Sequence, residues 1–243
     1  MTSILKTNAI EPEGATTNLV IGESGQNTVI SNNDIRANVL QDAGGNAVFT
    51  SNGSGVLSGV NSAFGSAMVL LSTQTASSSA SIIFTLPTAY KEVKFGFYNI
   101  HPSEDATFGW QVNADGETGY NETITSTFFR CWHREDGTVT GLSMPGSDFD
   151  QGQETGYQYL TTSVPDDNDS GCCGELFLFS PASTTYVKHF QGKASFWDTY
   201  TTANCMQAYT GGYINTTTNL SEISFKFLSG NVDAGTIKMW GVK

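Results

Sequence analysis

The sequence has few charged residues and lacks any sustained helical pattern of apolar side chains. Asp, Glu, Lys and Arg make up only 14% of the 243 residues, while Gly, Ser, Thr and Asn recur throughout. No window spaces its apolar residues at i, i+3, i+4 and i+7, as an amphipathic helix requires. Such a composition favours short strands joined by tight turns. We therefore expect an all-β protein with almost no helix.

Basic residues are scarce. The chain has 11 Lys and Arg against 23 Asp and Glu, a formal net charge of −12, and no basic cluster. Because an acidic surface repels phosphate backbones, binding to nucleic acid is disfavoured. No apolar run is long enough to span a bilayer, and the first residues lack the basic start and apolar stretch of a secretory signal. The sequence predicts synthesis in a cytoplasm and no membrane insertion.

Cysteine is rare, and its spacing matches no metal signature. Cys172 and Cys173 are adjacent, a poor arrangement for chelating one ion, and the others are Cys131 and Cys205. Thiols in a cytoplasm stay reduced. A disulfide formed after release, for example between Cys131 and one of the adjacent pair, is the alternative, and the sequence leaves its connectivity open. We expect no cofactor, apart from the calcium alternative below.

Signatures of enzymatic chemistry are absent or ambiguous. The chain has no Gly-x-Ser-x-Gly nucleophile motif, phosphate loop or dinucleotide fingerprint. Two acidic pairs, Glu104 with Asp105 and Asp148 with Asp150, have the residue types of a glycosidase, which holds two carboxyl groups across a sugar. Both pairs lie beside Gly, Ser or Pro in expected loops. The sequence favours a protein that is not an enzyme, with polysaccharide cleavage as an alternative.

The chain changes character near residue 62. Residues 1–62 contain no Trp, Tyr or Cys and carry a weak repeat, in which residues 27–33 (NTVISNN) align with residues 46–52 (NAVFTSN). Each unit is a turn, a short strand and a turn, too small to bury enough surface alone. Stacking against copies in a homotrimer would supply the missing partners. We predict an N-terminal stalk or attachment segment over 1–62 and a second domain over 63–243; a disordered leader is the alternative for the first.

Residues 63–243 contain a series of short, more hydrophobic segments separated by turn residues. Alternation in them is regular: Val93, Phe95 and Phe97 fall on one face, and Lys94 and Tyr98 on the other. One buried and one wet face is typical of an antiparallel sandwich, and roughly eight to twelve short strands fit a jelly roll. The expected strands are 67–72, 81–86, 93–100, 107–112, 124–133, 139–142, 157–161, 175–180, 185–190, 206–210, 223–228 and 235–241.

Several motifs, in order, resemble those of a family of virion proteins from marine bacteriophages. Residues 222–228 (EISFKFL) and 229–243 (SGNVDAGTIKMWGVK) form an expected hairpin that matches the family's closing pattern GNxxAGTIKxxG. Further matches are residues 90–102 (YKEVKFGFYNIHP), 174–181 (GELFLFSP) and 212–216 (GYINT). The resemblance therefore covers most of residues 63–243. Residues 40–46 (LQDAGGN) also resemble an N-terminal element of phage fibre proteins.

This resemblance implies a tail-fibre or head-fibre protein of a virion, made in a bacterial host and carrying a C-terminal jelly-roll domain. The expected role is attachment to host-surface polysaccharide, with residues 1–62 joining a homotrimer to other virion proteins. Trimeric repetition raises the avidity of a weak sugar site without new contacts. Capsid decoration that stabilises the head is the structural alternative, and a polysaccharide depolymerase is the enzymatic one.

Aromatic side chains near polar loops are the candidates for contact with host glycan. Amphipathic rings serve both sandwich cores and sugar-binding platforms, where Asn, Asp and Thr supply hydrogen bonds. Packing within the sandwich is the alternative role for each ring. The candidates are Trp132, Tyr157, Tyr159, Trp197 and Tyr200.

An acidic segment at residues 166–171 (DDNDSG) has the oxygen-rich, glycine-ended composition that suits Ca²⁺. Its ligands would be Asp166, Asp167 and Asp169. The segment departs from an EF-hand loop, because the twelfth position is Phe177 in place of a bidentate Glu. A solvated loop between strands is the alternative interpretation.

Overall fold

The computed structural model describes residues 39–41, 44–51, 54, 57–60, 67–146, 149–198 and 203–242. Every regular element among these residues is a β-strand, so the prediction of an all-β protein is confirmed. Within the same residues, no helix has the length and apolar character needed to cross a membrane. The chain divides into two units, Met1–Phe64 and Gly65–Lys243.

The first unit contains a small antiparallel sheet. Its strands are β1 (Val39–Gln41), β2 (Ala47–Ser51) and β3 (Leu57–Val60), in the order β1-β2-β3. Strand β2 coincides with the second unit of the expected repeat, while the first unit, residues 27–33, lies outside the described residues. Apolar side chains stay open to solvent here: Leu40 is 43% exposed and its cross-strand partner Phe49 is 37% exposed.

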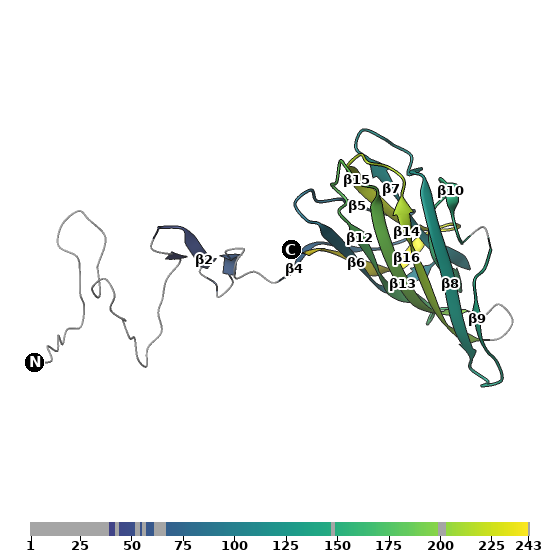
Figure 1. Ribbon diagram of the computed structural model, residues 1–243. Coiled ribbons are helices and arrows are strands. Elements are labelled where there is room, and N and C mark those ends of the chain that lie inside the picture. Colours follow the sequence, from purple (N-terminus) through teal and green to yellow (C-terminus); the bar gives the residue numbers. More distant parts are fainter. Residues whose placement is uncertain are drawn as a thin grey trace, which may run out of the picture. The chain divides into compact units, whose positions relative to one another are not determined.

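The second unit is a sandwich of two antiparallel sheets (Figure 1). The larger sheet has nine strands, eight of them in the order β10-β8-β14-β13-β12-β6-β16-β4, with β9 paired to β8. The smaller sheet has four strands in the order β11-β7-β15-β5. The strands are β4 (Met68–Thr75), β5 (Ile82–Thr85), β6 (Glu92–Pro102), β7 (Ala106–Ala114), β8 (Ile124–Arg134), β9 (Thr140–Ser143), β10 (Gly152–Glu154), β11 (Gln158–Val164), β12 (Cys172–Phe179), β13 (Lys188–Asp198), β14 (Asn204–Ile214), β15 (Leu220–Phe227) and β16 (Val232–Val242).

Each expected strand overlaps an observed one, but some bounds differ. The sequence predicts a strand over 185–190, whereas β13 continues to Asp198. Its second half alternates exposed polar residues with small buried ones, Gly192 and Ala194, so the hydrophobic signal is weak there. Strand β10 was not expected, because the three residues GQE carry no apolar alternation.

The C-terminal hairpin prediction is wrong. Strand β15 pairs with β5 and β7 in the smaller sheet, whereas β16 pairs with β6 and β4 in the larger one. The turn between them therefore crosses from one sheet to the other. The physical reason is that both strands carry an apolar face, with Phe225 buried on β15 and Ile237 buried on β16. Placing the strands in opposite layers buries both faces in one core.

The core lies between the two sheets, and aromatic residues dominate it. The predicted buried face of β6 is confirmed: Val93, Phe95 and Phe97 are at most 2% exposed. Phe225 of β15 packs against the rings of Phe95 and Phe97, with centroids 5.1 and 5.2 Å away. Phe108 of β7 lies 5.4 Å from Phe97. The aromatic rings thus join the facing strands of the two layers.

Candidate functional site

A cleft of about 610 Å³ lies on the inner face of the larger sheet, near the ends of β8, β13 and β14. Four strands of the smaller sheet face nine strands of the larger one, so part of the inner face is not covered. On β8, Phe128 is fully buried in the core, and Arg130, Trp132 and Arg134 follow at intervals of two on the same face. These three residues line the cleft instead of the apolar core.

Trp132 is held in place by the neighbouring strand. It pairs with Gly141 of β9, and a Cβ atom added to Gly141 would lie 2.6 Å from Cε2 of the Trp132 ring. The indole therefore lies directly against the backbone of β9. It can lie there only because residue 141 has no side chain. The ring is partly buried against the core and borders the cleft.

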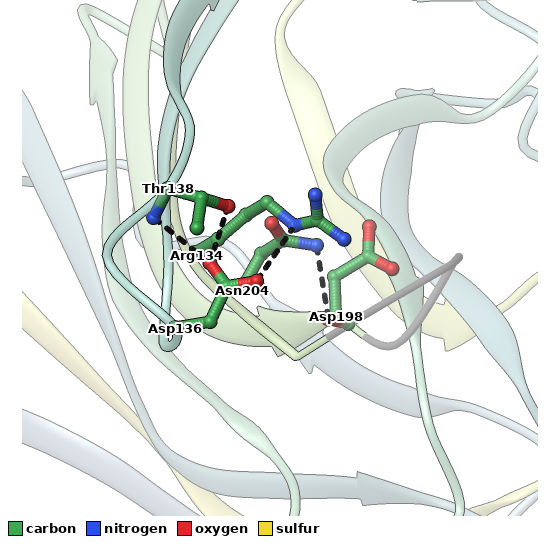
Figure 2. A network of polar contacts seen from close by, with 5 residues as sticks. All are labelled: Arg134, Asp136, Thr138, Asp198 and Asn204. Carbon is green, nitrogen blue, oxygen red and sulfur yellow. Dashed lines mark hydrogen bonds and ion pairs between the residues drawn. The ribbon is translucent and has the colours of Figure 1, made fainter.

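Polar contacts hold Asp198, which lines the cleft; Figure 2 shows the one with Asn204. The Thr162 hydroxyl donates to Asp198 Oδ2 at 3.1 Å, and Asn204 Nδ2 donates to the Asp198 carbonyl oxygen at 3.5 Å. Asp198 is only 5% exposed, so its carboxylate is held by neighbouring groups and not by bulk solvent. Asp198, Asn204 and Thr162 come from three strands, β13, β14 and β11, and meet only in the folded chain.

Arg134 is anchored on the side of the turn between β8 and β9. Its Nε lies 4.0 Å from Asp136 Oδ2, and Asp136 Oδ1 accepts bonds from the Thr138 backbone N–H and hydroxyl at 2.9 and 2.6 Å (Figure 2). The hydrogen bonds from Thr138 hold the pKa of Asp136 below its ordinary value. The turn thus keeps a charged carboxylate beside Arg134.

Arg130 differs from Arg134 in its counter-ion. The Nε atoms of both side chains are buried, but Arg134 has the Asp136 carboxylate 4.0 Å away. Arg130 forms no ion pair within the described part of the chain, and its Nε has no hydrogen-bond acceptor there. Its guanidinium carbon lies 5.9 Å from the centroid of the Trp132 ring. Only three arginines occur in the sequence, and the cleft contains two of them. The cleft thus places two guanidinium groups beside the carboxylates of Asp105 and Asp198.

The structure separates the five candidate sugar-contact residues. Trp132 lines the cleft, and Tyr159 packs edge-on against Phe149, a wall of the same cleft, with centroids 5.1 Å apart. Trp197 lies on the opposite, outer face of β13, since its neighbour Asp198 points into the cleft. Tyr200 lies outside the described residues.

Tyr157 covers the outer face of the smaller sheet. Its hydroxyl donates to Ser224 Oγ at 3.1 Å, and the Lys226 ammonium lies 4.4 Å from its ring centroid. Both partners belong to β15. Tyr157 is therefore part of the packing of that sheet and is separate from the cleft.

The acidic loop at 166–171 connects β11 to β12, and its aspartates are exposed. The Asp166 backbone N–H donates to Asp105 Oδ1 at 3.0 Å, and the Asp167 carbonyl oxygen lies 3.0 Å from His101 Nε2. Across the described residues, no three His, Cys, Asp or Glu side chains gather in a way that could hold a metal ion. Calcium at Asp166, Asp167 and Asp169 stays a prediction from the sequence alone.

Of the two predicted acidic pairs, Asp105 is the one described member that lines the cleft. Asp105 lines the cleft together with Asp198, which the sequence did not single out. Asp150 Oδ1 instead accepts a bond from the Phe128 backbone N–H, and Asp148 lies outside the described residues. The two carboxylates that share the cleft thus come from positions far apart in the chain.

All four cysteines are free thiols in the structure. Cys172 is buried, and burial raises the pKa of its thiol well above the ordinary value. Cys173 is exposed on the other face of β12, where its Sγ lies 3.3 Å from Asn99 Oδ1.

A shallower groove of about 370 Å³ lies on the outer face of the larger sheet. The rings of Phe129 and Tyr209 stack there, with centroids 4.9 Å apart and an interplanar angle of 12°. Phe129 is 40% exposed and Tyr209 is 36% exposed. Gly211 adds no side chain to the groove. This surface offers aromatic area without the arginines of the cleft.

Glu175 of β12 lies on the same outer face and forms two ion pairs. Its carboxylate oxygens lie 2.8 Å from Lys193 Nζ and 2.7 Å from Lys94 Nζ. The hydrogen bond from Lys193, followed by that from Lys94, lowers the pKa of Glu175. Since the folded pKa lies below the unfolded value, the pairs stabilise the protein above about pH 4.3, and this contribution is lost as pH falls through the folded pKa.

We expect Glu175→Gln to lower the free energy of unfolding at pH 7 by about 1 kcal/mol or less, because solvent screens a partly exposed pair. The difference from the natural protein should shrink at pH 3. Urea unfolding at both pH values measures it. Exposed Glu154 provides the control, and Glu154→Gln should change little at either pH. A pH-independent loss in Glu175→Gln would contradict the ion-pair explanation.

The fold and this site define an antiparallel β-sandwich with a charged, aromatic cleft at the margin of its two sheets. Comparison of the chain with protein-family models, with curated proteins and with solved structures finds no match.

Proposed function

We propose that the chain is a structural protein of a bacteriophage virion, a fibre-type appendage that attaches the particle to a host-surface glycan. The ordered motifs of residues 90–102, 174–181, 212–216 and 222–241 support the virion assignment through their resemblance to marine phage proteins. The repeated passage of the chain between the two sheets agrees with a jelly-roll domain, a fold common in viral proteins and lectins.

The cleft beside Trp132 is the observation that carries the attachment role. A sugar presents apolar C–H faces and a ring of hydroxyl groups, so a site for it needs an aromatic surface with hydrogen-bonding groups around it. Trp132 supplies the surface, and Asn204, Asp198 and Thr162 supply donors and acceptors along the same cleft. Because β9 fixes the indole in advance, little conformational entropy is lost on binding.

The N-terminal unit supports assembly into a homotrimer that joins other virion proteins through residues 1–62. Apolar side chains of its small sheet, such as Leu40 and Phe49, are exposed in the single chain. Stacking against copies would cover them. Light scattering of the full-length protein should give a trimer, and a monomer of 26.0 kDa would count against the fibre arrangement.

The attachment role predicts that Trp132→Ala weakens binding of the purified protein to host surface polysaccharide by about tenfold or more, as is usual for a central aromatic contact. Biolayer interferometry on immobilised polysaccharide measures this. Tyr209→Ala is the matched control, because Tyr209 is an exposed ring on the other face of the sheet. Equal losses of affinity in both variants, or a loss in Tyr209→Ala alone, would show that the cleft is not the glycan-binding site.

Location on the particle separates fibre from capsid decoration. Immunogold electron microscopy with antibody to residues 63–243 should label the tail or its fibres. Gold spread over the head would favour a decoration protein or head fibre, and capsid stability would then be the assay. Particles without label would defeat the virion assignment.

A polysaccharide depolymerase is the second candidate, favoured by the two carboxylates, Asp105 and Asp198, that line the cleft. Glycoside cleavage requires such a pair. Release of reducing sugar ends from host polysaccharide, abolished in Asp105→Asn, would establish this activity. Binding without release supports attachment.

A further inference from the structure

Arg130 in the cleft is a cation that forms no ion pair with the described residues. The Arg130 Nε is buried and has no acceptor among the described residues, and the guanidinium forms no ion pair with them. A buried donor without an acceptor costs about 1–3 kcal/mol, so it requires an explanation, and a bound ligand that supplies the acceptor is one. The Arg134 Nε is likewise buried, but it has a counter-ion, the Asp136 carboxylate, at 4.0 Å.

We propose that the cleft binds the carboxylate of an acidic sugar, a uronic acid residue of a polysaccharide, with Arg130 as its ion-pair partner and Trp132 against the sugar ring. This inference rests on the proposed function and specifies its ligand. A guanidinium presents two parallel N–H donors that match the two oxygens of a carboxylate. The guanidinium carbon lies 5.9 Å from the Trp132 ring centroid, so the two groups are adjacent and can contact the same sugar residue.

The charge balance favours a single carboxylate over a phosphate or sulfate polymer. The cleft holds two arginines and two aspartates, Asp105 and Asp198. These four charges cancel, so the cleft accommodates one added negative charge beside Arg130 better than the several charges of a phosphate or sulfate polymer. A polymer of high charge density would also meet the surface of a protein with net charge −12. A uronic acid carries one charge per sugar and keeps the C–H face that Trp132 needs.

The test uses full-length protein and matched probes. The probes are oligosaccharides of galacturonate, glucuronate, mannuronate and guluronate, each with a carboxyl-reduced form in which the acid has become a primary alcohol. We expect at least one acidic probe to bind about ten- to a hundredfold more tightly than its reduced form. Affinity for the acidic probe should fall as salt rises from 50 to 500 mM, because salt screens the ion pair.

Arg130→Gln should lower affinity for the acidic probe by about tenfold or more and leave affinity for the reduced probe unchanged. Arg130→Lys should retain part of the affinity, since it keeps the charge and loses the paired donors. Lys238→Gln removes one positive charge from β16, outside the cleft, and should bind as the natural protein does. Near-UV circular dichroism confirms that each variant is folded, and Arg130→Lys carries the test if Arg130→Gln does not fold.

The outcomes separate this inference from the proposed function. Equal binding of acidic and reduced probes, with no effect of Arg130→Gln, overturns the carboxylate site and leaves glycan attachment standing. Tighter binding of dextran sulfate or inorganic phosphate than of every uronic probe also overturns it, as does binding of no uronic probe. Failure to bind any host polysaccharide, or host cells, removes the proposed function itself.

Discussion

Phe225→Ala is expected to lower the free energy of unfolding by about 3–5 kcal/mol, the usual cost of removing a fully buried phenylalanine. Phe225 is 0% exposed and lies at the centre of an aromatic cluster that both sheets build. Its ring centroid is 5.1 Å from Phe95, 5.2 Å from Phe97 and 6.3 Å from Phe84. Alanine would leave a cavity that the surrounding rings, fixed on separate strands, fill only in part.

The measurement is urea unfolding of the full chain, with a thermal scan as a second readout. For a domain of this size the loss corresponds to a drop in Tm of roughly 6–20 °C. Leu228→Ala is the control, because Leu228 directly follows β15 and is 39% exposed. It should cost under about 0.5 kcal/mol. Similar losses in the two variants would show that the aromatic cluster does not dominate the stability of the sandwich.

Gly235→Ala is expected to cost about 2–6 kcal/mol, from backbone strain and overpacking together. Gly235 has φ +111°, a conformation that residues with a side chain rarely adopt. A Cβ atom there would lie 2.8 Å from Ile100 Cα and 2.9 Å from Asn99 C. Both contacts are backbone atoms of the neighbouring strand β6, so neither can rotate away. The register between β16 and β6 shifts at this residue, which identifies it as an irregularity of the pairing.

Gly116→Ala separates the two contributions. Gly116 also has a positive φ, +83°, but a Cβ atom there would meet nothing within 4 Å. It should cost about 1–2 kcal/mol from strain alone. Urea unfolding of both variants gives the comparison, and a cost for Gly235→Ala no greater than that for Gly116→Ala would contradict the packing argument.

The glycines of the C-terminal motif have structural reasons. Besides Gly235, a Cβ atom at Gly230 would lie 2.6 Å from Ser103 Oγ, and one at Gly241 would lie 2.6 Å from Cε1 of the Tyr90 ring. The glycines of the motif GNxxAGTIKxxG are therefore required by the packing of the last strand against β6 and the loops beside it. It indicates fold and carries no direct information on a ligand.

The sequence by itself determined the fold class. Period-two alternation, as in Val93, Phe95 and Phe97, depends only on the geometry of a single strand, and it predicted the buried face of β6 correctly. The shift in composition near residue 62 lies close to the division of the chain into Met1–Phe64 and Gly65–Lys243. Both features are local, so they can be read without knowing which strands are neighbours.

Only part of the candidate site could be predicted from the sequence. Trp132 was selected for its ring, but Arg130 and Arg134 were not, although two of only three arginines at alternate positions of one strand were a usable signal. Pairing of β15 and β16 was predicted from their short separation and was wrong, because burial of two apolar faces placed them in opposite sheets. Only the tertiary structure decided that a nine-stranded sheet packs against a four-stranded one. It also decided that Arg130, Asp198 and Thr162 meet in the cleft, where the smaller sheet does not cover the larger one. Strand order and sheet coverage arise from contacts between distant segments, which local patterns do not encode.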